Sequence, residues 1–336
     1  VVHFGTDRNN LASFEGTSAA VDSSLTNGEA YSYNHVTVTG LQANTTYYYT
    51  VEKSGTETEV QTYTTGDFES AQILYVGDPQ IGASKGQPQN GEELVADSGA
   101  ANTAARNDGF AWDRTLDIAT AQNPGLDFVI SAGDQVNTAG NEYEYAGYLY
   151  PEAMDSLPSS NITGNHDSGN KNYSWHFNNP NSFNTDGSQS AYTDGHTTAG
   201  SDYYFTYGDV LYISIDTNNY NCATHENVIK KAVDENKDCK WRVVIFHQDI
   251  YGSGADHSDS DGMVLRTQLT PLMDEYDIDV VLQGHDHTYS RSYQLTGDGK
   301  EHKEYNNSNY RGDEDYQKEN LCYNLTSTAE DGNTLT

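Results

Sequence analysis

Five short apolar segments, each followed closely by a polar side chain, constrain this chain more than any other feature. The clearest is DFVISAGDQVN, residues 127–137, in which the apolar run Phe128–Ile130 leads through Gly133 to Asp134. Such a run is typical of a strand that is buried on both faces. Because ligands bind beyond the carboxyl ends of strands in open α/β sheets, Asp134 is well placed for chemistry.

The same pattern recurs in four more segments. ILYVGD ends in Asp78, SSNITGNHD contains Asn165, His166 and Asp167, VVIFH ends in His247, and DVVLQGHDH contains His285 and His287. Each motif alone is a weak signal, since G-D after a strand is usually a turn and H-x-H occurs by chance. Their order, their places at strand ends and their shared nitrogen and oxygen chemistry together favour a site for two metal ions.

The charge of the chain limits its partners. Its 336 residues can bury a full core in one large and one small domain. Asp and Glu outnumber Lys and Arg by 50 to 17, for a formal charge of −33. So acidic a surface repels nucleic acid and anionic membranes, and we expect neither as a partner. An anionic substrate would need locally fixed cations, which bound metals would supply. Much of the excess of acidic residues is also consistent with a solvated surface that has no specific function.

The chain ends and the cysteines carry less information. No apolar run approaches the length of a membrane span, and no signal peptide is present. The chain opens in a strand-like segment, so we expect its natural N-terminus to lie upstream, and we predict an extracellular or cell-surface location. Oligomeric state is left open. Three cysteines are too few for a disulfide scaffold, and Cys222 and Cys239 could equally form a bridge or stay as free thiols.

Two patterns divide the chain into domains. Residues 1–66 alternate apolar or aromatic with polar side chains between Gly and Asn turns, which predicts a small β-sandwich with strands near residues 1–5, 30–41, 45–53 and 59–65. A linker is expected at Thr64–Asp67. From Ala71, buried strands alternate with helices, so residues 67–336 are predicted to form an α/β domain with two central sheets flanked by helices.

Within this second domain, residues 81–107 are polar and Gly-rich, which predicts a loop that lasts until about Asp108. Residues 168–200 are expected to form a long surface loop. The expected helices cover residues 110–122, 142–150, 224–236 and 264–276, and a hairpin pairs 203–207 with 210–216. A last strand is predicted over 289–295. Residues 296–336 are polar and are predicted to be an insertion or a tail.

Taken together, the five motifs resemble those of the calcineurin-like metallophosphoesterases. The resemblance is to the branch like purple acid phosphatases, which carries a small fibronectin-like β-domain before the catalytic domain, and it extends to about Leu295. It implies a four-layer αββα sandwich that hydrolyses phosphate esters with two divalent ions. It also implies a ligand set in which Asp134 bridges both ions, Asp78 and His287 bind the first, and Asn165, His247 and His285 bind the second.

The residue chemistry agrees with that placement. Carboxylate, amide and imidazole ligands suit Mn, Fe or Zn, and the motifs contain no thiolate for a soft-metal site. Two ions about 3.5–4 Å apart would clamp the attacking and leaving oxygens of an in-line displacement and lower the pKa of a bridging water. A shared carboxylate is needed to hold the ions this close, and Asp134 is the candidate.

Five further residues have more than one interpretation. His166 is the predicted general acid, with Asp167 as a carboxylate that could raise its pKa, although His166 could instead only pack or hydrogen-bond. Asp167 and Asp286 either orient the ligand imidazoles or are solvated. His257 and Arg291 are candidate substrate contacts. A surface position is the simpler interpretation for His257, and a structural role fits Arg291 equally well.

Two positions depart from the family pattern. Many members have a His two residues after the first Asp, where this chain has Gln80. Purple acid phosphatases have a Tyr three residues after the bridging Asp, where this chain has Asn137. Both amides can ligate through oxygen, so both stay candidate ligands. The loss of the phenolate disfavours ferric iron at the first metal position.

The sequence therefore predicts metal-dependent hydrolysis of phosphate esters, most simply of monoesters. A phosphodiesterase or a nucleotidase would use the same centre. The alternative from another class is a non-catalytic surface module that keeps the fold for binding. Such a module would be expected to lose some of the six ligands, and all six are present.

Overall fold

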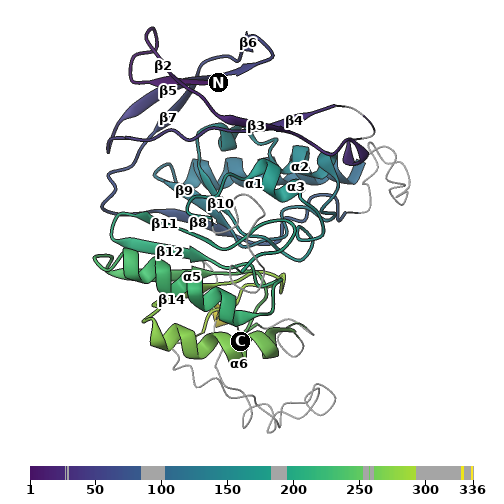
Figure 1. Cartoon of the computed structure of the whole chain (residues 1–336), viewed down its shortest axis with the longest axis vertical. Coiled ribbons are helices and arrows are strands. Elements are labelled where there is room, and N and C mark those ends of the chain that lie inside the picture. Colours follow the sequence, from purple (N-terminus) through teal and green to yellow (C-terminus); the bar gives the residue numbers. More distant parts are fainter. Residues whose placement is uncertain are drawn as a thin grey trace.

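Figure 1 shows the computed structural model of the chain. It describes residues 1–26, 28, 30–84, 103–182, 195–252, 257, 261–292, 327–328 and 334–335. An all-β unit lies at one end, followed by a layer of helices, two β-sheets and a second layer of helices (Figure 1). The predicted fold class, a four-layer α/β sandwich preceded by a small all-β unit, is confirmed.

The N-terminal unit is entirely antiparallel. Its larger sheet contains β1 (Val2–Gly5), β2 (Ala12–Phe14), β5 (Thr46–Lys53), β6 (Thr56–Glu57) and β7 (Gln61–Thr64) in the order β2-β1-β5-β6, with β7 also beside β5. The 3-10 helix η1 (Ser23–Leu25) connects a separate pair, β3 (Thr17–Ala20) and β4 (Ser32–His35). Aromatic side chains stabilise the larger sheet, and the rings of Phe4 and Tyr47 stack at 4.8 Å.

The first central sheet is parallel and has the order β10-β9-β8. Its strands are β8 (Ile73–Val76), β9 (Phe128–Ser131) and β10 (Ser159–Asn161). The outer layer contains α1 (Thr103–Gln122), α2 (Glu142–Tyr148), the 3-10 helix η3 (Glu152–Asp155) and α3 (Asn172–His176). Leu74 and Val76 of β8 pack against Trp112 and Leu116 of α1, which buries the apolar face of that helix.

The second central sheet has the order β11-β12-β13-β14. In it, β11 (Tyr203–Tyr207) runs antiparallel to β12 (Val210–Ser214), while β13 (Trp241–Ile245) and β14 (Val280–Leu282) run parallel to β12. Two helices, α5 (Cys222–Glu235) and α6 (Asp261–Glu275), cover its outer face. A separate short pair consists of β15 (Ser327–Thr328) and β16 (Thr334–Leu335).

Side-chain alternation along β13 shows how the layers are held together. Val243 and Ile245 pack against Phe128 and Ile130 of the first sheet. Val244 points the other way, into the cluster formed with α5 and α6. Since successive residues of a strand face opposite sides, a continuous apolar run is what a strand between two covered faces requires.

Five expected elements differ in the structure. Helix α1 begins at Thr103, inside the expected loop, because its first turn is buried: Ala104 and Ala105 are buried, and a Cβ on Gly147 of α2 would lie 2.9 Å from the carbonyl oxygen of Ala105. The expected loop over 168–200 contains the short helix α3. Residues 289–292 form no strand, and 293–295 lie outside the described residues. The expected strand over 30–41 is paired only at Ser32–His35, and the expected hairpin strand over 210–216 ends at Ser214.

The remaining expectations about organisation have mixed outcomes. Cys222 and Cys239 are free thiols, so the alternative of a bridge between them is wrong. Strand β7 ends at Thr64 and β8 begins at Ile73, and the division after residue 66 stays a prediction. Among the described helices, none has the length and apolar character needed to cross a bilayer.

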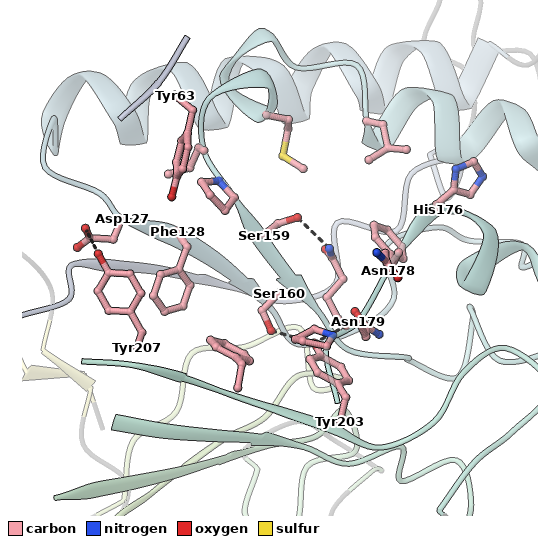
Figure 2. A pocket seen from close by; sticks show the side chains of 18 of the residues that line it. Tyr63, Asp127, Phe128, Ser159, Ser160, His176, Asn178, Asn179, Tyr203 and Tyr207 are labelled. Atoms are coloured by element: carbon pink, nitrogen blue, oxygen red, sulfur yellow. Dashed lines mark hydrogen bonds between the residues drawn. The ribbon is translucent and has the colours of Figure 1, made fainter. Parts of the chain in front are cut away.

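A cavity of about 570 Å³ lies beside β10 (Figure 2). Its lining comes from β7 of the N-terminal unit, from β9, β10 and β11, and from the segment after α3. It therefore lies where the N-terminal unit meets the sandwich.

The packing of α1 on β8 can be tested by cavity formation. Leu116 is fully buried, so Leu116→Ala should lower the free energy of unfolding by about 2–5 kcal/mol. Ile118 on the same helix is 47% exposed, so Ile118→Ala should change it by less than about 0.5 kcal/mol. Denaturant unfolding of both variants measures the difference, and equal effects would contradict this placement of α1.

Candidate metal centre

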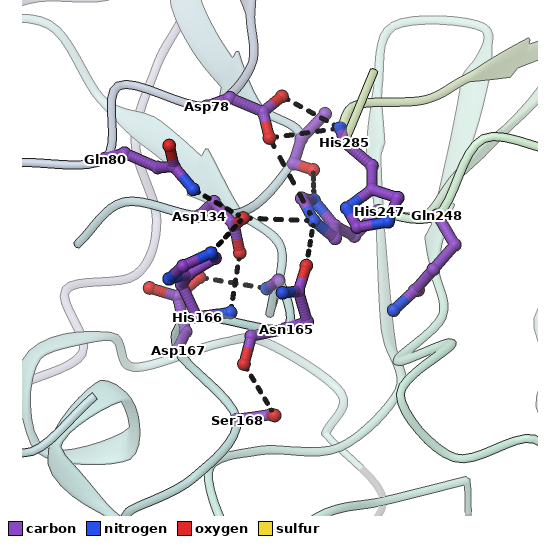
Figure 3. Close-up of polar contacts among 12 residues, drawn as sticks. Asp78, Gln80, Asp134, Asn165, His166, Asp167, Ser168, His247, Gln248 and His285 are labelled. Atoms are coloured by element: carbon purple, nitrogen blue, oxygen red, sulfur yellow. Dashed lines mark hydrogen bonds and ion pairs between the residues drawn. The ribbon is translucent and has the colours of Figure 1, made fainter. Parts of the chain in front are cut away.

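The polar residues predicted from the strand ends meet at one edge of the two sheets. Figure 3 shows side chains that follow β8, β9, β10, β13 and β14 turned toward a common centre, namely Asp78, Asp134, Asn165, His247 and His285. All five strands run parallel to a neighbour within their own sheet, so their carboxyl ends emerge together on each side of the inter-sheet core.

Asp134 occupies the middle of this cluster and is 1% exposed. Its Oδ1 accepts a hydrogen bond of 2.8 Å from the backbone N–H of His166. Its Oδ2 lies 3.3 Å from Nε2 of Gln80 and 3.3 Å from Nε2 of His247. One carboxylate thus contacts the segments that follow β8, β10 and β13.

His247 is oriented as a metal ligand would be. Its Nδ1 donates to the carbonyl oxygen of Ala132 at 2.8 Å, so Nδ1 carries the hydrogen. The other ring nitrogen, Nε2, faces Oδ1 of Asn165 at 2.9 Å and Oδ1 of Asp78 at 4.0 Å. A backbone carbonyl that fixes one imidazole nitrogen and leaves the other for the metal is a usual outer contact of metal sites.

Asp78 links the cluster to the segment after β14. The backbone N–H of His285 donates to both of its carboxylate oxygens, at 3.1 and 2.9 Å. Nε2 of His287 lies 3.6 Å from Oδ1 of Asp78. Ligand atoms of Asp134, His247 and His285 all lie within 4.8 Å of one another, which is close enough for a shared ion.

The backbone around the centre is strained. Of ten non-glycine residues with positive φ among the described residues, five lie here: Asp78 (54°), Gln80 (37°), Asp134 (51°), His285 (71°) and His287 (42°). Each such conformation costs on the order of 1–3 kcal/mol and persists where the surroundings enforce it. This concentration of strain is typical of a functional site.

Electrostatics shows a centre that concentrates negative charge. Burial raises the pKa of Asp78. The charge of Asp134 raises it further, while the charge of His247 lowers it. Burial would raise the pKa of Asp134 too, but hydrogen bonds and charge from His247 and His166 lower it. Burial would lower the pKa of His247, but Asp134 and Asp78 raise it to about 9. Carboxylates so placed need a positive partner, and metal binding would release the His247 proton.

Asp167 and His166 have separate surroundings. Asp167 is fully buried, and its carboxylate accepts backbone N–H groups from Gly164 at 2.9 Å and from Gln135 and Val136 at 3.3 Å. Burial and the neighbouring Asp134 raise the pKa of Asp167 to about 8. These bonds join the segments after β9 and β10, so Asp167 supports the backbone of the site.

His166 is oriented by a main-chain group that the sequence did not indicate. Its Nδ1 lies 2.7 Å from the carbonyl oxygen of Asn137, and its Nε2 lies 4.0 Å from Oδ2 of Asp134. The side chain of Asn137 instead contacts Oγ1 of Thr138 at 3.5 Å. Asn137 therefore contributes its backbone carbonyl to the site, while its amide lies at the edge of hydrogen-bonding range of Thr138.

The outer candidates fall into two groups. The ring of His257 stacks on that of His285, with centroids 3.7 Å apart, and its Nδ1 lies 3.8 Å from Oδ1 of Asp286. His257 is thus brought to the rim of the centre, and Asp286 lies behind it. Arg291 is exposed, near the end of the described segment.

Sequence reasoning missed a buried amide network beside His247. Gln248 donates to Oδ1 of Asn218 at 2.9 Å and accepts from Thr217, and Asn218 donates to the carbonyl oxygen of Thr163 at 3.1 Å. These residues also follow strand ends, β12 and β13, so the rule that found the ligands would have found them.

The comparisons with known proteins agree with this geometry. Residues 71–289 match the family model of calcineurin-like phosphoesterases, which is more than half of the chain. The chain belongs to this family. As a family member it is a metallophosphoesterase, and the predicted resemblance is confirmed.

Individual relatives match smaller shares. Two uncharacterized proteins of Mycobacterium tuberculosis, MT2654 and Rv2577, are each 39% identical over 57 residues, which is 17% of this chain and 11% of each relative. The structure of purple acid phosphatase PPD1 from seeds of yellow lupin (Lupinus luteus) is similar with a TM-score of 0.59 and 17% identity, over 87% of this chain and 55% of that one. The likeness to the lupin structure concerns the fold.

The family and the shared fold imply a dinuclear metal centre, and the residues present fit one. The converging donors are carboxylate, amide and imidazole groups, which suit divalent Mn, Fe or Zn. The correct tautomer of His247 and the excess of negative charge support the same conclusion.

Close backbone approach at Gly164 provides a test of the centre. A Cβ on this residue would overlap Oδ1 and the backbone N of Asp134, so Gly164→Ala should displace that carboxylate and lower the metal content of the purified protein. Gly169 in the same loop is the control, because a Cβ there would only touch Ala139 at 3.7 Å. Elemental analysis should find less metal in Gly164→Ala than in Gly169→Ala, and equal contents would contradict the role of Asp134.

Proposed function

We propose that this metallophosphoesterase hydrolyses phosphate monoesters at a centre of two divalent ions. In the proposal Asp134 would be shared by both ions, Asp78 and His287 would hold the first, and Asn165, His247 and His285 would hold the second. The observation that carries it is the contact of one buried carboxylate, Asp134, with the segments after three strands. When bound, the ions would polarise the phosphate and make a water nucleophilic near neutral pH.

His166 is the proposed general acid. Its Nδ1 donates to the carbonyl oxygen of Asn137, so Nε2 would carry the second proton of the imidazolium and pass it to the leaving oxygen, which leaves a neutral imidazole. Nε2 lies 4.0 Å from the carboxylate of Asp134. The side chain is 36% exposed, which leaves room for a substrate beside it. General acid catalysis of this kind contributes roughly a hundred- to ten-thousand-fold to the rate.

Substrate binding depends on the ions in this proposal. The net charge of −33 disfavours the binding of anions. The polar contacts that build the centre come from Asp, Asn, Gln and His side chains and from backbone groups. His257, stacked on His285 at the rim, is the candidate side chain for the substrate. Gln80 and Asp286 are proposed to hold Asp134 and His257 in place. An extracellular or surface location stays a prediction.

The decisive experiment is a substrate panel on metal-loaded protein. Mn, Zn or Fe(II) protein should hydrolyse phenyl phosphate faster than bis-phenyl phosphate, and Asp134→Asn should lose activity together with at least one metal equivalent. Faster diester cleavage would replace the monoesterase with a diesterase. Two bound metals without turnover of any ester would favour a non-catalytic binding module.

The role of His166 predicts a dependence on the leaving group. Phenolates with electron-withdrawing groups leave without help, so His166→Ala should slow 4-nitrophenyl phosphate far less than an alkyl phosphate, with metal content unchanged. His3 on β1 is the control, and His3→Ala should affect both substrates equally little. An equal loss on both esters in His166→Ala would point to positioning instead of proton transfer.

The metal sites are predicted to hold divalent ions and to be colourless. Asn137 is neutral where the resembling phosphatases have a phenolate that stabilises ferric iron. Two tyrosines near the motifs are the alternative sources of a phenolate. Tyr289 is 66% exposed, and Tyr251 packs on the core beside α6 with Arg266 5.4 Å from its ring.

Spectroscopy of iron-loaded protein tests this. Protein loaded with iron in air should show no strong visible charge-transfer band, whereas Asn137→Tyr should gain one if the position faces the first metal. A band in the unchanged protein, with activity that requires ferric iron, would show that another tyrosine supplies the phenolate.

A further inference from the structure

The cavity beside β10 is separate from the metal centre. It holds about 570 Å³, and none of the six proposed metal ligands lines it. Figure 2 shows it walled by Tyr63 of the N-terminal unit, by Phe128 and Ser160 of the first sheet, and by Tyr203 of the second. This volume is in the usual range for small-molecule sites, roughly 300–1,000 Å³.

Aromatic rings form much of the wall. The lining includes Tyr63, Phe128, Phe177, Tyr203, Phe205 and Tyr207. The rings hold one another in place, since Phe128 meets Phe205 edge-on at 5.9 Å and lies 5.3 Å from Tyr207. Because ring faces carry partial negative charge, such a wall attracts cations as well as apolar groups.

The charged groups of the lining are carboxylates. Asp127 lies at one end, where it accepts hydrogen bonds from the hydroxyl of Tyr207 at 2.6 Å and from the backbone N–H of Gln72 at 2.8 Å. Asp155, which is exposed, also lines the cavity, and no Lys or Arg is among the lining residues. The lining histidine, His176, is paired with Glu142 at 3.0 Å. A phosphate ester would meet two carboxylates without an opposing cation, so this cavity suits ligands unlike the substrate.

The other end of the cavity offers hydrogen-bond acceptors. The amide nitrogen of Asn178 donates to Thr37 at 3.3 Å, and that of Asn179 donates to Tyr173 at 2.9 Å. With their nitrogens used in this way, the two side-chain oxygens are left as acceptors among the described contacts. Acceptors here and carboxylates opposite both favour a ligand that donates hydrogen bonds.

We propose that this cavity binds a small organic cation, with an ammonium group on an aromatic or aliphatic body. The positive group lies at the Asp127–Tyr207 end, and the body lies against Phe128 and Phe205. This site is independent of the proposed hydrolysis, because its ligand has the opposite charge to a phosphate ester and touches none of the proposed metal ligands.

Binding of benzylammonium to the full chain at neutral pH tests the proposal, because this probe is a cation that also donates hydrogen bonds. Calorimetric titration at low salt should show saturable binding at one site, weaker binding of neutral benzyl alcohol and none of benzoate. Asp127→Asn keeps an oxygen for Tyr207 but removes the charge, so it should weaken binding of the cation roughly fivefold. Asp117→Asn on α1 removes an exposed charge elsewhere and should leave binding unchanged.

A second variant tests the aromatic wall. Phe205→Leu keeps apolar volume but removes a ring face, so it should weaken binding of the cation more than binding of benzyl alcohol. The proposal is overturned if binding of the cation does not saturate, if benzoate binds as tightly as the cation, or if Asp117→Asn weakens binding as much as Asp127→Asn.

Discussion

The buried carboxylate of Asp134 is the constraint on which the site depends. It contacts His166, Gln80 and His247, which come from segments after three different strands in two sheets. A carboxylate with 1% exposure is costly unless positive or hydrogen-bonding groups surround it, so the loops must converge around it. The positive φ at Asp134 is part of the cost of that convergence.

The inter-sheet core makes the convergence possible. Phe128 and Ile130 of β9 pack against Val243 and Ile245 of β13, and this contact fixes how the two sheets are aligned. The alignment brings the carboxyl ends of β9 and β13 together, so that Ala132 just after one strand can hold His247 just after the other. Apolar packing between the sheets therefore determines the hydrogen-bond distance between His247 and Ala132 at their edge.

The sequence predicted the parts whose cause is local. The apolar runs before Asp134 and His247 identified buried strands, and the polar residue after each run identified a site residue. Both features depend only on a few consecutive residues, so they can be recognised in the sequence. Helix α1 begins earlier than predicted because its first turn is buried through contact of Ala105 with Gly147, which is far away in the chain. The orientation of His166 by the carbonyl of Asn137 was also hidden, since every residue has a carbonyl and only the fold selects one.

Negative charge has two different uses in this fold. Around Asp134 and Asp78 the carboxylates are buried and face imidazoles, so what balances them must be small and strongly charged, as a divalent ion is. At the cavity, Asp127 lies beside aromatic rings and shares its charge with the hydroxyl of Tyr207, which suits a larger and more weakly hydrated cation. An anionic ester can approach the first region only through bound metal and has no means to enter the second. The same acidic composition thus separates the ligands of the two sites by charge and by size.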